Sequence, residues 1–440
     1  MAPHGCYERG VHDRLRVFPV RGGIYPSARC AFRFVLELGQ YGATSILSDD
    51  FDRALSALLV APFYFPATSI ERLPVAPGVT TPLAALLIQR IGAAGPITLA
   101  EFMAAALGHP QHGYYAKQRQ QTDPFGIAGD FITAPEISQV FGELLGLWAL
   151  DLWQRLDIPG PMQLVELGPG RGSLMQDILR VMARHPKMTK DLSVHLVEIS
   201  PGLRASQKDR LGKSNVSLAW YDHVSEVPQA PFILIANEFL DALPVRQFHR
   251  QDDGWHEVMV GINKDGNLTL GVASNVSVLS DLLPSVSEGD VIEWCPAAVS
   301  IVDEIARRLH HVPGAALLID YGYDTPLGKP TLQAIKNHRS VDLLTEPGGA
   351  DISAHVDFSA LAAQGKAKGL VVHGPVDQGI FLRRLGAEVR CEQLMASVPE
   401  KAEITRMGVT RLINPGQMGR LFKVMAFTQA QAPLPSGFAD

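Results

Sequence analysis

The sequence predicts an α/β protein with a doubly wound, mostly parallel sheet, a helical N-terminal part and an antiparallel insertion. Three observations carry this prediction. Short apolar runs alternate with helical stretches, which places strands at 163–167, 194–198, 232–236 and 315–320. A glycine-rich segment directly follows the first of these runs. Residues 244–273 alternate in polarity around Asn263-Lys-Asp-Gly266, a pattern typical of a β-hairpin turn.

The elements that precede the sheet are predicted from helix-capping residues. Thr81 stands before a proline and an apolar stretch, which indicates a helix that begins at the proline. Thr98 and Glu101 have the spacing of a capping box and predict a second, short helix. A third pattern of this kind spans 133–136 and precedes a stretch with one apolar helical face. The region 81–158 is therefore predicted to be a helical cap.

The remaining chain divides by composition. Residues 1–80 contain eight arginines and no lysine, and they are predicted to be an N-terminal extension without an assigned role. The core is expected over 159–430, with insertions at 244–314 and 322–365. The second insertion is rich in turns and polar residues, which predicts a long loop over one end of the sheet. Two closing strands and a flexible tail are expected at 370–373, 421–427 and 431–440.

The composition argues against several classes of protein. The chain has 440 residues, with 39 Lys and Arg against 45 Asp and Glu, and its net charge of −6 argues against nucleic-acid binding. No uninterrupted apolar run reaches about 18 residues, so no stable membrane insertion is expected. Paired histidines such as His109 and His112 lack the spacing of a zinc site, and no metal is expected. The widely separated cysteines are expected to be reduced thiols: Cys6, Cys30, Cys295 and Cys391.

Residues 165–173 (VELGPGRGS) have the pattern of a strand-turn-helix loop that binds a nucleotide. Gly168, Gly170 and Gly172 allow a tight turn and a close approach of the ligand to the backbone. The third glycine falls one position early for a dinucleotide-binding motif, so NAD fits poorly. Glu166 would repel a pyrophosphate but attract the cationic methionine end of S-adenosylmethionine. The order E-x-G-x-G-x-G resembles motif I of class I methyltransferases, whose fold is Rossmann-like.

Three further acidic residues are candidates for cofactor binding. Glu198 ends the second predicted strand, where a carboxylate can accept hydrogen bonds from both ribose hydroxyls. Asp222 follows the stretch LAWY at 218–221, and it stands where an acidic residue of such folds commonly meets the adenine amino group. Asp130 is flanked by a glycine just before a predicted helix and is expected to fold over the cofactor. The alternative is a solvated strand end for the first two residues and an ordinary turn for the third.

The candidate catalytic residues follow the predicted strand at 232–236. Asn237, Glu238 and Asp241 lie just beyond its end, with apolar residues between them. Two carboxylates at one pocket could hold a guanidinium by charge-assisted hydrogen bonds, so an arginine acceptor would suit them. In the alternative, Glu238 caps the following turn while Asp241 pairs with Arg246. The Asn/Asp-Pro-Pro-aromatic tetrapeptide typical of N6-adenine and glutamine methyltransferases is absent from this place.

The chain resembles the MidA family of S-adenosylmethionine-dependent methyltransferases. The resemblance covers about residues 81–428 and rests on six strings that occur in the order typical of that family. They are HPQHGYY at 109–115, GDFITAPEISQVFGE at 129–143, ELGPGRG at 166–172, NEFLDALP at 237–244, IDYGY at 319–323 and ADISAHVDF at 350–358.

The resemblance implies a class I methyltransferase core that uses S-adenosyl-L-methionine, with insertions on the substrate side. Mitochondrial members are complex I assembly factors that methylate, symmetrically, an arginine of the quinone-site 49-kDa-type subunit of NADH dehydrogenase. A protein acceptor of this kind is therefore expected, with Asp320 or Tyr321 on the acceptor side. The expected setting is the bacterial cytoplasm, or the mitochondrial matrix in a eukaryote, and a homodimer is the expected oligomer.

Two other functions stay open from the sequence. The chain could be an assembly chaperone that binds the cofactor without catalysis and grips a partner subunit through its inserted loops. It could also methylate a small molecule, although long insertions better suit a large acceptor.

Overall fold

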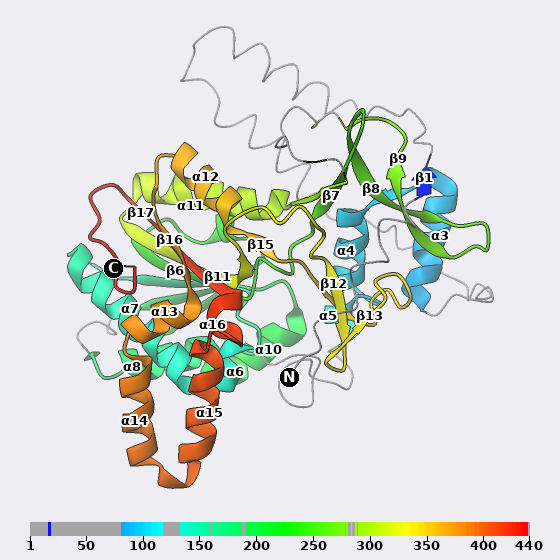
Figure 1. Cartoon of the computed structure of the whole chain (residues 1–440). Coiled ribbons are helices and arrows are strands. Elements are labelled where there is room, and N and C mark those ends of the chain that lie inside the picture. The colour runs from blue at the N-terminus through cyan, green and yellow to red at the C-terminus, as the bar shows by residue number, and fades with distance from the viewer. Residues whose placement is uncertain are drawn as a thin grey trace, which may run out of the picture.

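The larger sheet has the strand order β16-β17-β11-β6-β3-β4-β5, and the end of β11 also pairs with β15 (Figure 1). The computed structural model describes residues 16–18, 81–117, 133–157, 160–186, 191–277, 279, 283, 287 and 289–438. The strands of this sheet are β3 (Gln163–Leu167), β4 (Ser193–Val197), β5 (Ser217–Tyr221), β6 (Phe232–Asn237), β11 (Gly314–Tyr323), β15 (Val356–Asp357), β16 (Val371–Asp377) and β17 (Phe422–Thr428). Strand β17 pairs antiparallel with β16 and β11, and the other pairs are parallel, so the predicted doubly wound, mostly parallel sheet is confirmed.

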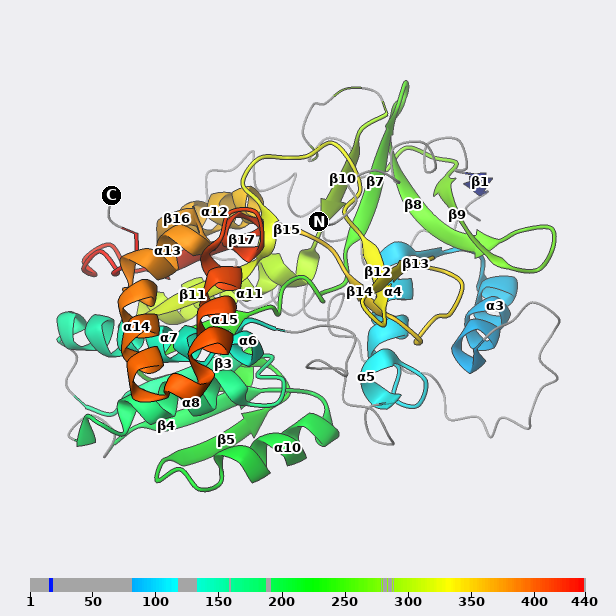
Figure 2. The ribbon, with the colours of Figure 1, turned by 60° about the horizontal axis from the view of Figure 1, so that its bottom comes forward.

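Helices cover both faces of this sheet because alternate strand residues point to opposite sides. Leu164 of β3 packs with α7 and α8 in one apolar cluster, whereas Val165 packs with α11 and α12 in another. Figure 2 shows α14 and α15 as a helical hairpin beside the first of these layers. The helices of the core are α7 (Gln139–Leu156), α8 (Ser173–Met182), α10 (Pro201–Leu211), η2 (Val224–Glu226), α11 (Pro296–His311), α12 (Phe358–Ala367), α13 (Gln378–Arg384), α14 (Ala387–Ser397), η4 (Pro399–Lys401), α15 (Ala402–Ile413) and α16 (Met418–Leu421).

A second sheet, with the order β1-β9-β8-β7-β10 and β2 paired to β8, forms a separate lobe (Figure 1). The hairpin between β8 and β9 turns at Asn263, whose side-chain oxygen accepts hydrogen bonds from the amides of Asp265 and Asn267. Thr98 and Glu101 form the predicted capping box with both hydrogen bonds present. The elements here are β1 (Arg16–Phe18), α3 (Pro82–Ala94), β2 (Ile97–Thr98), α4 (Leu99–Gly108), α5 (Tyr114–Lys117), β7 (Arg246–Gln251), β8 (Gly254–Ile262), β9 (Leu268–Ala273) and β10 (Val291–Trp294).

Two sequence-based expectations were wrong in their local structure. The pattern at 133–136 opens only the short helix α6 (Ala134–Ile137), and Thr133 makes no capping hydrogen bond. Ser138 instead caps the long helix α7, because its hydroxyl accepts from the amide of Val140. The expected loop after residue 322 contains a three-stranded antiparallel sheet, which such short strands do not announce by periodicity. Its strands are β12 (Gln333–Lys336), β13 (Arg339–Val341) and β14 (Asp351–Ser353).

Two predicted boundaries also differ from the structure. Helix α11 lies within the predicted insertion 244–314, yet its apolar face packs on the larger sheet. The tail predicted to be flexible is docked as far as residue 438. Trp148 donates to the carbonyl of Ser436 at 3.1 Å, and the rings of Phe381 and Phe438 lie 5.3 Å apart. These aromatic contacts anchor the segment. In the described part of the chain, no helix combines the length and apolarity that crossing a bilayer requires.

Candidate active site

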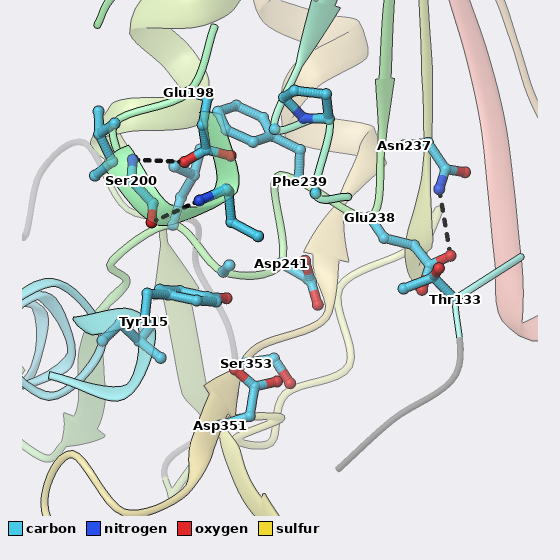
Figure 3. Close-up of a pocket in the computed structure, with 18 of the residues that line it drawn as sticks. Tyr115, Thr133, Glu198, Ser200, Asn237, Glu238, Phe239, Asp241, Asp351 and Ser353 are labelled. Carbon is cyan, nitrogen blue, oxygen red and sulfur yellow. Dashed lines mark hydrogen bonds between the residues drawn. The ribbon is translucent and has the colours of Figure 1, made fainter. Parts of the chain in front are cut away.

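One large cavity lies where the parallel strands β3, β4, β6 and β11 end. Its volume is about 1860 Å³, and it extends from the glycine loop after β3 to the three-stranded sheet. Figure 3 shows that Tyr115, Glu198 and Ser353 border it from separate elements, together with Phe239 and Asp241 of one loop. The carboxyl ends of parallel strands are the usual binding edge of a doubly wound sheet. The cavity is therefore the candidate active site.

The glycine loop needs the backbone freedom that glycine has. Gly168, Gly170 and Gly172 have φ values of 61°, 51° and 79°, in the left-handed region that favours glycine. A Cβ atom at Gly168 would lie 2.5 Å from the ring of Phe239, so a side chain there would collide with the loop after β6. The glycine loop therefore lies close to both the cavity and the loop after β6. Gly168, Gly170 and the following Arg171 all line the cavity.

Glu166 is suited to a cationic ligand group. Its side chain is 3% exposed, and its Oε2 atom has no hydrogen-bond partner in the described structure. Burial raises the pKa of Glu166 to about 8. Asn237, two residues beyond the register partner of Glu166 on β6, faces the same side and has an unpartnered Oδ1 atom. Both atoms can accept hydrogen bonds from an ammonium group, which fits the methionine end of S-adenosyl-L-methionine.

Glu198 is held in place by its surroundings at the end of β4. Its Oε1 atom accepts from the amide of Ser200 at 2.7 Å, and Gln207 donates to its Oε2 atom at 3.4 Å. Gln207 also donates to the carbonyl of Gly170 at 2.7 Å, so one side chain links this carboxylate to the glycine loop. Burial raises the pKa of Glu198, while these hydrogen bonds oppose the shift. Glu198 lines the cavity, where a ribose hydroxyl could reach its carboxylate.

The other two residues that were predicted to bind the cofactor are Asp222 and Asp130. Asp222 lines the cavity, but its side chain is 61% exposed and forms an ion pair with Arg204 at 2.6 Å. Any hydrogen bond from an adenine amino group would therefore compete with Arg204 and with water. Asp130 lies outside the described residues.

The residues after β6 form what we call the acidic loop, residues 238–241. Glu238 has φ of 49°, an uncommon conformation for a residue with a side chain. Its Oε1 atom accepts from the amide of Ala134 at 2.7 Å and from the side chain of Asn237 at 3.3 Å. Burial raises the pKa of Glu238 to about 7, and the negative charge of Asp241 adds to this shift. The structure thus brings Asn237, Glu238 and Asp241 to one side of the cavity.

Asp241 points into the part of the cavity near Tyr115 and Ser353 (Figure 3). Burial raises the pKa of Asp241 to about 6, and a hydrogen bond with the Tyr321 side chain opposes that shift. The alternative pairing of Asp241 with Arg246 is wrong, because the guanidinium of Arg246 binds the carboxylate of Glu257 at 2.6 and 2.7 Å.

Asp320 and Tyr321 differ in their relation to the cavity. Tyr321 lines it, as expected, whereas Asp320 is fully buried behind the acidic loop and is not among the lining residues. The capping of the turn that was weighed for Glu238 is made by Asp320, which accepts hydrogen bonds from three consecutive amides of the loop. Burial raises the pKa of Asp320, the charges of Asp241 and Glu238 add to the shift, and the backbone hydrogen bonds oppose it.

Sequence reasoning missed several residues of the acceptor side. Tyr115 of α5 and Asp351, Ser353 and His355 of the segment around β14 all line the cavity. Burial raises the pKa of Tyr115, and the charges of Asp351 and Asp241 add to this shift, which indicates that the three groups lie close together. Only the quoted strings at 109–115 and 350–358 could have pointed to them, since these residues are far apart along the chain and show no periodic pattern.

Comparisons with known proteins agree with this site. A family model for S-adenosyl-L-methionine-dependent methyltransferases matches residues 144–376. The human "Protein arginine methyltransferase NDUFAF7, mitochondrial" is 37% identical over 379 residues, which cover 80% of this chain and 84% of the human protein. A Caenorhabditis elegans homologue of the same name is 35% identical over 393 residues and covers 82% and 92% of the two chains.

A solved structure of a Burkholderia thailandensis protein is also similar to this chain. That structure contains bound S-adenosyl-homocysteine, and the TM-score is 0.71, with 30% identity and coverage of 81% of this chain and 94% of that one. S-adenosyl-L-methionine is accordingly the cofactor that Glu166, Gly168, Gly170 and Glu198 are suited to bind. The chain belongs to the MidA-like family of S-adenosyl-L-methionine-dependent methyltransferases.

Proposed function

We propose that this methyltransferase transfers the methyl group to an arginine side chain of a protein acceptor. The observation that carries this proposal is the acidic loop, which presents two half-buried carboxylates beside the cofactor end of one cavity. A guanidinium is a planar cation with several N–H donors, so paired carboxylates recognise it well. The size of the cavity, about 1860 Å³, also suits an acceptor larger than a small metabolite.

The chain's own residues would hold and prepare the acceptor. The cofactor supplies a methyl group on a positively charged sulfur, and a nitrogen lone pair displaces the sulfur in line. Glu238 and Asp241 hold the guanidinium so that one nitrogen faces that methyl group. The new N–C bond forms as the C–S bond breaks, and the nitrogen then loses a proton. Glu238, with its pKa of about 7, can accept that proton near neutral pH.

The partner and the setting are further parts of the proposal. The resemblance to the MidA family suggests the 49-kDa-type subunit of NADH dehydrogenase as the acceptor. The similar proteins from human and Caenorhabditis elegans are named as mitochondrial, which does not support the cytoplasmic expectation for a chain of this kind. We propose a compartment that contains this NADH dehydrogenase subunit: the mitochondrial matrix in a eukaryote, or the cytoplasm in a bacterium. We also propose that the protein forms a homodimer and that it methylates the acceptor arginine symmetrically.

The test is methyl transfer from isotopically labelled S-adenosyl-L-methionine to the purified 49-kDa-type subunit, read by mass spectrometry of methylated arginines. Label on arginine with the wild-type protein, and none with Glu238→Gln, supports the proposal. Label on another residue type would refute the arginine assignment. If a folded Gly170→Trp variant that cannot bind the cofactor still supports complex assembly in cells, the protein acts as a chaperone instead.

A further inference from the structure

The acidic loop rests on a carboxylate that does not reach the cavity. Asp320 is 0% exposed near the end of β11, and its Oδ2 atom accepts from the amides of Phe239, Leu240 and Asp241 at 3.1, 2.8 and 3.3 Å. Its Oδ1 atom accepts from the amide of Tyr321 at 2.9 Å. We infer that Asp320 is a positioning residue for methyl transfer, which sets the conformation of the acidic loop through these amides. This inference rests on the proposed function of that loop.

The strand register explains how one side chain reaches three amides. Asn237 of β6 pairs with Ile319 of β11, and the amide of Glu238 donates to the carbonyl of Ile319 at 2.9 Å. The chain then leaves the strand through the left-handed conformation of Glu238, with φ of 49°. This turn directs the next three N–H groups towards Asp320. Without an acceptor there, three backbone donors would lose their hydrogen bonds, of which the bond from Leu240 is buried and the other two are half-buried. A buried donor left without a partner costs about 1–3 kcal/mol, so the turn would rearrange.

The acidic loop is fixed from its other side by backbone contacts. The carbonyl of Asp241 accepts from the amide of Ala354 at 3.0 Å, which joins the loop to the segment after β14. Tyr321, whose amide binds Asp320, uses its side chain to hydrogen-bond Asp241 and Ser353. Asp320 therefore binds the backbone amide of Asp241 and also that of Tyr321, whose side chain hydrogen-bonds Asp241. Through both contacts, Asp320 sets the position of Asp241. A displacement of about 1 Å at such a site can lower the rate about a hundredfold.

Two variants separate the acceptor oxygens of Asp320 from its shape. Asp320→Asn keeps the size of the side chain but has only one carbonyl oxygen. Whichever way its amide is turned, an NH₂ group then faces backbone N–H donors. Asp320→Glu keeps the charge but moves the carboxylate by one methylene. Glu143→Gln serves as the matched control, because Glu143 is 3% exposed, pairs with Arg180 and Arg390, and does not line the cavity.

The experiment measures hydrogen exchange of the amides 239–241, the affinity for S-adenosyl-homocysteine and the kcat for methylation of the 49-kDa-type subunit. For Asp320→Asn and Asp320→Glu we expect lost protection of these amides, unchanged cofactor affinity and a fall of kcat of about a hundredfold. Glu143→Gln should lower only the melting temperature. Protection retained in both Asp320 variants, or protection lost with kcat unchanged in the folded proteins, overturns the inference.

A pH profile distinguishes positioning from a direct role of Asp320 in proton transfer. The titratable groups that face the loop are Glu136 of α6, Tyr115 of α5, Tyr321 of β11 and Asp351 of β14, besides Asp320 itself. If Asp320 acts only by holding the three amides, kcat in Asp320→Asn should fall by a similar factor at every pH at which the wild-type protein is active. A fall confined to one limb of the pH profile contradicts the inference. If the wild-type protein transfers no methyl group, the proposed function fails, while the exchange measurement still tests the loop.

Discussion

The cofactor side and the acceptor side of the cavity are built in different ways. On the cofactor side, Glu166 lies in β3, the glycine loop follows β3, and Glu198 follows the adjacent strand β4, all within a short stretch of chain. On the acceptor side, Tyr115, the acidic loop and the segment around β14 come from parts of the chain that are far apart. The first side depends on local backbone geometry and the second on tertiary packing. We therefore expect that the two sides can be altered separately.

The largest effect is expected from a variant that alters the acceptor side alone. Glu238→Gln removes a carboxylate that can hold the guanidinium and accept its proton, so kcat for methyl transfer should fall by about a thousandfold. Its affinity for S-adenosyl-homocysteine should stay within the error of the wild-type value, as measured by calorimetry. An equal loss of affinity and rate would mean that the two sides are not separable.

The next largest effect is expected from a variant that alters the cofactor side alone. Glu198→Ala removes the proposed acceptor for the ribose hydroxyls, at a cost of about 1–3 kcal/mol in cofactor binding. The dissociation constant for S-adenosyl-homocysteine should therefore rise by about tenfold to a hundredfold. At saturating cofactor, kcat should change little. Asp222→Ala is the matched control, because Asp222 is 61% exposed and pairs with Arg204, so its removal should weaken binding less.

The pH dependence of the rate sharpens the comparison, because both acceptor carboxylates have raised pKa values of about 7 and about 6. They must be ionised to hold a cation. As pH falls through this range they become neutral, so kcat/KM should drop by about tenfold or more per pH unit below about pH 6. The acid limb should be shifted in Asp241→Asn, as read from initial rates at saturating cofactor. A flat profile between pH 5 and 8 would refute the assigned roles.

The smallest effect concerns the stability of the protein without cofactor. The pKa of Glu166 is raised from 4.5 to about 8, so the folded state binds a proton that the unfolded state releases between these values. Stability contributed by this group is therefore present below about pH 4.5 and is lost as pH rises through about 8. Glu166→Gln should therefore stabilise the cofactor-free protein more at pH 8 than at pH 5. Denaturant titration at pH 5 and pH 8 measures this, and equal effects at both values contradict it.

The sequence predicted the cofactor side far better than the acceptor side. Strand ends and glycines carry their meaning within a few residues, so the β3 strand, the glycine loop and Glu198 could be placed from local pattern alone. The capping pattern at 133–136 misled, because the carboxylate of Glu136 binds the guanidinium of Arg171, a residue 35 positions later. No local rule reports such a contact.

The role of Asp320 shows the same limit. From the sequence it could only be expected somewhere on the acceptor side. Its burial behind the acidic loop depends on the pairing of β11 with β6, which is a property of the assembled sheet. The three-stranded sheet beyond residue 322 was likewise hidden, because short strands in a polar segment have no clear period of two.

The most direct test of the separation between the two sides is calorimetric titration of S-adenosyl-homocysteine into the wild-type protein, Glu238→Gln and Gly170→Trp. The account predicts micromolar binding, about −8 kcal/mol, for the first two proteins and none for the third. Loss of binding in a folded Glu238→Gln variant, or retained binding in Gly170→Trp, would contradict it.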